Sequence, residues 1–230
     1  MATDRTALLA VPAAAAMLLW PAVWNGYPIV FTDTGTYLSQ AIHRYAGWDR
    51  PVFYSVFMLA LHWTRTVWPV IAAQALLAAW ILWLVWRVLA PTRGPSGFLA
   101  LIAFLTVGTW LPWLVSELMP DLFTPLLVLA LCLLAWTPDA LSRTERWTLV
   151  FLATFFIATQ QSSVPLSVGI VLLVGAAQAW RMRRRLRVAV PMWSGLLIPP
   201  VLAALLLCSA NLLAHHRFAL SPFGNVFLLA

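Results

Sequence analysis

Residues 68–89 read WPVIAAQALLAAWILWLVWRVL, an apolar run in which the only charged residue is Arg87, close to its end. A helix of about 20 apolar residues is long enough to cross the hydrocarbon core of a bilayer. Comparable apolar runs fill much of the chain, at residues 6–24, 97–115, 122–136, 147–159, 164–180 and 189–214. The sequence therefore predicts an all-α, polytopic transmembrane helix bundle with about seven spans.

The composition excludes an ordinary soluble domain. Hydrophobic residues make up 63% of the chain and charged residues 9%, whereas a soluble domain carries about a quarter charged residues. The net charge of +7 comes from arginine alone, and the arginines flank the apolar runs. We therefore expect membrane lipid as a partner and no nucleic acid. No polar linker interrupts residues 1–230, so we expect one transmembrane module.

The arginines also predict the orientation. If the N-terminus is cytoplasmic and residues 51–66 do not cross, ten of the fourteen basic residues lie inside. These are Arg5, Arg87, Arg93, Arg143, Arg146, Arg181, Arg183, Arg184, Arg185 and Arg187, which leaves Arg44, Arg50, Arg65 and Arg217 outside. Because cytoplasmic loops carry excess positive charge, this arrangement is favoured. Residues 51–66 then form a juxtamembrane helix that completes the first outer loop.

Acidic residues gather on the predicted outer face. Asp33 lies in the first outer loop, before a short helix through Tyr45 that Thr34 or Thr36 can cap. It either caps that helix or takes part in chemistry. Glu117 and Asp121 lie in the second outer loop, where they are solvated loop acids, a general base, or ligands of a divalent cation.

A basic residue precedes the juxtamembrane helix. In Arg50-Pro51-Val52-Phe53-Tyr54, Pro51 suits a first helical turn. Arg50 could bind a phosphate by a two-pronged contact or extend towards lipid headgroups. His62 and Arg65 follow at the other end of this segment.

Three features, taken in order, resemble the GT-C superfamily of membrane glycosyltransferases, which includes protein O-mannosyltransferases and aminoarabinose transferases. They are Asp33 after the first span, the basic-proline segment Arg50-Pro51-Val52-Phe53-Tyr54, and the pair Pro120-Asp121 opening a later span. The resemblance covers residues 1–180 at the level of pattern. It departs from the family in having a single acid in Thr32-Asp33-Thr34 and Val52 in place of a second proline.

The resemblance implies a function and roles for these residues. A sugar would pass from a polyprenyl-phosphate donor to an acceptor at the outer face of a bacterial-type inner membrane. Asp33 would be the base, and Glu117 and Asp121 would orient the acceptor, or bind a divalent metal cation together with Asp33. Arg50, with His62 or Arg65, would neutralise the donor phosphate.

Two alternatives stay open at this point. The departures from the family motif fit a catalytically inactive GT-C-like protein that binds a lipid-linked sugar or assembles with a protein partner. A small-solute transporter would instead show paired halves with interrupted helices, a symmetry that this sequence lacks. Because full GT-C members have further spans and often a soluble domain, we expect the chain to be the N-terminal part of a longer protein.

Overall fold

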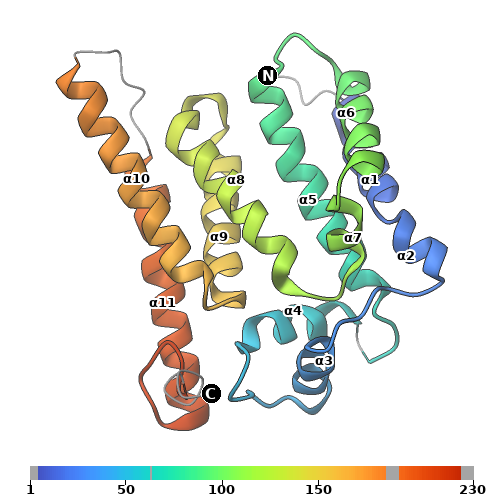
Figure 1. The fold of residues 1–230 in the computed structure, drawn as a ribbon, viewed down its shortest axis with the longest axis vertical. Coiled ribbons are helices and arrows are strands. Elements are labelled where there is room, and N and C mark those ends of the chain that lie inside the picture. Colours follow the sequence, from blue (N-terminus) through green and yellow to red (C-terminus); the bar gives the residue numbers. More distant parts are fainter. Residues whose placement is uncertain (1–4, 63, 185–191, 224–230) are drawn as a thin grey trace. The chain divides into compact units, whose positions relative to one another are not determined.

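A computed structural model describes residues 5–62, 64–184 and 192–223, and most of these are helical. Arg185, Arg187, the predicted start of the last span at residue 189, and residues 224–230 lie outside this part of the chain. The chain divides into two compact units (Figure 1). Unit 1 comprises Met1–Ile42 and Ser55–Leu122, and unit 2 comprises His43–Tyr54 and Phe123–Ala230.

Unit 1 is built around three packed helices, because α1 lies against both α5 and α6. Its described elements are α1 (Arg5–Leu18), α2 (Trp20–Asn25), α3 (Thr34–His43), α4 (Val52–His62), α5 (Trp68–Leu89), α6 (Pro95–Gly108), α7 (Leu111–Ser116) and the 3-10 helix η1 (Pro120–Leu122). The last residue of α3 and the first three of α4 belong to unit 2. Fully buried Leu18, Ile71 and Phe98 contribute to its core, and Trp83 meets Phe98 edge-to-face at 5.2 Å.

Prolines divide two of the predicted spans. The predicted span 6–24 consists of α1 and α2, with Pro21 in the first turn of α2. The predicted span 97–115 likewise consists of α6 and α7, with Pro112 in the first turn of α7. A proline has no N–H to donate and clashes with the preceding turn, but it suits a first helical turn. In each case the new helix begins one residue before the proline.

Unit 2 is a bundle in which α9 packs against both α8 and α11. Its described elements are α8 (Phe123–Trp136), the 3-10 helix η2 (Pro138–Ala140), α9 (Arg143–Thr159), α10 (Ser163–Arg183) and α11 (Trp193–His215). Phe123 stacks on Phe156 with ring centroids 4.8 Å apart. The buried ring of Tyr54 meets Phe123 at 5.9 Å, so it anchors the segment His43–Tyr54 to this bundle.

In the described residues, three helices are long and apolar enough to cross a membrane: α5, α10 and α11. They indicate an integral membrane protein. The helices α1, α6, α8 and α9 have 14, 14, 14 and 17 residues, which is shorter than the usual span of about 20. The count of seven spans therefore stays a prediction, as does the orientation. The 11 residues of α4 extend about 16 Å, which is shorter than a usual span, and that residues 51–66 do not cross stays a prediction.

Candidate functional site

The predicted second outer loop is fixed to the first outer loop inside unit 1. The main chain of Ile29 pairs with the loop, because Ile29 N–H donates to Ser116 O at 2.9 Å and Leu118 N–H donates to Ile29 O at 2.9 Å. At the start of α3, Thr34 Oγ1 donates to Leu118 O at 3.1 Å. These bonds place the acidic segment Ser116–Asp121 next to the residues that precede α3.

A buried glutamine fixes the same loop from α5. Gln74 Nε2 donates to Glu117 O at 2.8 Å and to Val115 O at 3.3 Å. Together with the bonds from Ile29 and Thr34, this means that each of the four carbonyls from residue 115 to residue 118 accepts a hydrogen bond from a distant part of unit 1. The sequence analysis missed Gln74. Its position as the single carboxamide within the apolar run 68–89 could have indicated a functional residue.

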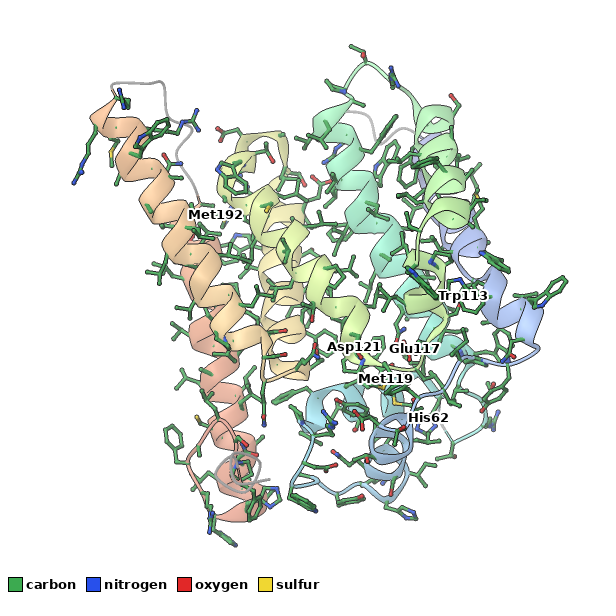
Figure 2. The ribbon with its side chains drawn as sticks, in the orientation of Figure 1. His62, Trp113, Glu117, Met119, Asp121 and Met192 are labelled. Atoms are coloured by element: carbon green, nitrogen blue, oxygen red, sulfur yellow. The ribbon has the colours of Figure 1, made fainter. Side chains whose placement is uncertain are left out.

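The fixed loop carries two neighbouring carboxylates. Partial burial raises the pKa of Glu117 above its ordinary value, and the negative charge of Asp121 raises it further. Glu117 and Asp121 lie at the same end of unit 1, together with Met119 and His62 (Figure 2). Ionised carboxylates can orient a hydroxyl group by accepting its hydrogen bond.

Asp33 lies immediately before α3, as the sequence predicted. Its main-chain carbonyl accepts a hydrogen bond from Tyr37 N–H at 3.2 Å, and its side chain is half-buried. The helix begins at Thr34 and ends at His43, two residues earlier than expected, because Arg44 adopts a left-handed conformation with φ 55°. The bond from Thr34 to the second loop keeps Asp33 in the same region of unit 1, which leaves both the capping role and the chemical role open.

The predicted cation site does not fit this geometry. Within the described part of the chain, no three or more His, Cys, Asp or Glu side chains gather closely enough to hold a metal ion. Asp33, Glu117 and Asp121 are all described, so they do not form a ready set of ligands. We therefore derive no step that uses a metal.

The two predicted phosphate-binding residues of unit 1, His62 and Arg65, differ in their exposure to solvent. His62 is buried, with 3% of its surface exposed, and its Nδ1 accepts the Thr64 N–H at 2.7 Å. This bond assigns the proton of the neutral ring to Nε2, which has no hydrogen-bond partner in the structure. A phosphate cannot reach His62 in this conformation, whereas Arg65 is exposed.

Arg50 belongs to unit 2, where it is exposed and lines a hollow with Gln161 and Asn211. The two amides are engaged with the chain that follows α11. Asn211 Nδ2 donates to Ala219 O at 2.8 Å and Gln161 Nε2 donates to Leu220 O at 3.2 Å. Of the polar side chains that line the hollow, Arg50 is the one suited to an anion.

Comparison of the chain with protein-family models, with curated proteins and with solved structures gives no match. The resemblance to GT-C glycosyltransferases therefore depends on the sequence motifs alone.

Proposed function

We propose that this chain is a GT-C-like glycosyltransferase module, which transfers a sugar from a polyprenyl-phosphate donor to an acceptor at the outer face of the membrane. The observation that carries the proposal is the hydrogen-bonded junction between the two acidic outer loops, Ile29–Thr34 and Ser116–Asp121. An acid of the first loop and two acids of the second thereby lie in one region of unit 1, at a loop in which four successive carbonyls accept hydrogen bonds.

The proposed reaction is a direct displacement at the anomeric carbon. The acceptor oxygen forms a bond to that carbon while the bond from the carbon to the phosphate oxygen breaks. Asp33 takes the acceptor proton, and Glu117 and Asp121 orient the acceptor. The polyprenyl phosphate leaves with the bonding electron pair, and the resemblance implies that a basic side chain, Arg50 or Arg65, neutralises its charge. Positioning and charge stabilisation supply most of the rate in such a reaction. Buried His62 has no direct part in it.

The test uses the full chain in lipid nanodiscs with a panel of polyprenyl-phosphate sugars, and mass spectrometry to follow release of the polyprenyl phosphate. Asp33→Asn should lower the rate by about 100-fold or more, because it removes the base. It should leave membrane insertion intact, since Asn also caps helices well. The matched control is Asp139→Asn, which changes an exposed acid of η2 in unit 2.

The outcomes separate the alternatives. Full activity of Asp33→Asn would reduce Asp33 to a capping residue and remove the proposed base. If the wild-type chain binds a donor but releases no polyprenyl phosphate with any acceptor, the protein is an inactive binder of lipid-linked sugar and the enzymatic proposal is wrong.

A further inference from the structure

Gln74 is an unusual residue for its position. Apart from Arg87 in the last turn, it is the only side chain of α5 that bears an amide or a charge. It is also fully buried. A carboxamide removed from water is costly unless it is hydrogen-bonded, and polar residues within membrane-spanning helices usually serve a function.

The partners of Gln74 show what that function is. Helix α7 ends at Ser116, and the last carbonyls of a helix have no partner within it. Gln74 Nε2 supplies a donor to Val115 O at this end and to Glu117 O just beyond it. The side chain therefore acts as a cap for α7 that a different helix provides. Of the donors to this loop described above, Gln74 is the one that bonds to the main chain of Glu117 itself.

We infer that Gln74 is a positioning residue, which holds the main chain at Glu117 so that the Glu117 carboxyl stays beside Asp121. Its catalytic meaning rests on the proposed function, in which this pair of acids orients the acceptor. Without the bond at 2.8 Å, Glu117 O loses the donor from α5, and only the bonds to the neighbouring residues Ser116 and Leu118 restrain the Glu117 carboxyl beside Asp121. A displacement of about 1 Å in a catalytic group can lower a rate by about 100-fold.

The environment of Glu117 can be measured without any sugar transfer. Dicyclohexylcarbodiimide reacts with protonated carboxyl groups, and mass spectrometry of the peptide that contains Glu117 gives the pH midpoint of this reaction. Asp139, which is exposed in unit 2, is the internal reference. Asp121 is the charged group that acts on Glu117, and it is unchanged in the variants below, as are Asp33, His62 and Arg65.

The variant Gln74→Met removes the donor while nearly keeping the length of the side chain. We expect the Glu117 midpoint to fall, and the transfer kcat to drop by about tenfold or more with little change in the acceptor KM. Gln178→Met is the matched control, because it removes a buried glutamine from α10 of unit 2. It should move neither quantity.

A Glu117 midpoint that is unchanged in Gln74→Met would overturn the inference. If that variant fails to insert, Gln74→Asn gives the same comparison, because its amide is one methylene too short to keep the bond to Glu117 O. If the midpoint falls but no variant and no wild-type sample transfers sugar, the positioning role holds and the proposed function fails.

Discussion

At the scale of single residues, the pKa of Glu117 has a consequence for stability. Burial and the charge of Asp121 both raise the pKa of this carboxyl in the folded protein above 4.5. The folded state therefore binds a proton more tightly than the unfolded state. As the pH rises from 4.5 through the folded pKa, the free energy of unfolding decreases, and above that pKa the loss is complete.

We therefore predict that Glu117→Gln, which stays neutral, unfolds at a higher temperature than the wild type at neutral pH. The difference should amount to a few degrees at most, because Glu117 is only partly buried, and it should vanish below pH 4.5. Thermal unfolding in detergent across this pH range measures it. A gain that persists unchanged at low pH would mean that the charge of Glu117 is not its source.

A second prediction at this scale compares two exposed arginines. Arg50 lines the hollow of unit 2, and Arg65 follows α4 in unit 1. Lysine cannot make the two-pronged contact that a guanidinium makes with a phosphate. Arg50→Lys should raise the donor KM by about tenfold, which corresponds to the loss of one hydrogen bond to a charged group. Arg65→Lys should be nearly silent. Donor titrations of both variants measure the two KM values. A larger rise in the donor KM for Arg65→Lys than for Arg50→Lys would reassign the phosphate to Arg65.

At the scale of elements, α9 begins with a capping box. Ser142 Oγ accepts the Glu145 N–H at 3.2 Å, and Glu145 Oε2 accepts the Ser142 N–H at 2.8 Å. Because α9 packs against both α8 and α11, the start of this helix matters for the whole of unit 2.

We predict that Ser142→Ala lowers the free energy of unfolding by about 1 kcal/mol, the usual cost of losing such a cap. Unfolding in mixed detergent, followed by circular dichroism, measures it. Ser142→Thr keeps the hydroxyl and should restore most of the stability, and a loss equal to that of Ala would exclude the cap as the cause.

The elements also show what sequence patterns can predict. The helix α5 begins and ends at the residues expected from the sequence, because the apolar run 68–89 is continuous and Pro69 lies in its first turn. The breaks before Pro21 and Pro112 were not predicted, since hydrophobicity continues through both positions. Hydrophobicity reports burial in lipid or protein, but it does not report the missing N–H of a proline.

At the scale of the whole molecule, the acidic residues of the candidate site were visible in the sequence, but the contacts that hold them were not. Gln74 and Glu117 are 43 positions apart, and the pairing of Ile29 with Glu117 joins two loops that no periodicity connects. The division into two units, which assigns Arg50 to one and His62 to the other, also depends on long-range packing. Neither could be inferred from local pattern or composition.

The proposed outer-face site requires a particular orientation, and each unit offers its own test of it. In unit 1, Arg65 precedes the 22 residues of α5 and Arg93 follows them, so the two lie at opposite ends of a helix about 33 Å long. In unit 2, Arg183 is the last residue of α10. Arg44 lies in the segment whose Gly47 O is 3.1 Å from His215 Nε2, at the other end of α11. All four arginines are exposed, so access to a reagent reports the side of the membrane. Ser116, also in the predicted outer loop, is fully buried and cannot serve as a reporter.

We predict that single cysteines at Arg44 and Arg65, in a chain whose Cys132 and Cys208 are replaced by alanine, react with a membrane-impermeant maleimide applied to intact cells. Cysteines at Arg93 and Arg183 should react only after permeabilisation, because excess arginine marks the cytoplasmic side. Each unit carries one reporter for each side of the membrane, so the orientation of each unit is tested independently. Outside labelling of Arg183→Cys would reverse unit 2 and the position of Arg50. Outside labelling of Arg93→Cys would place Asp33, Glu117 and Asp121 in the cytoplasm, and no transfer from an outer-leaflet donor could then use them.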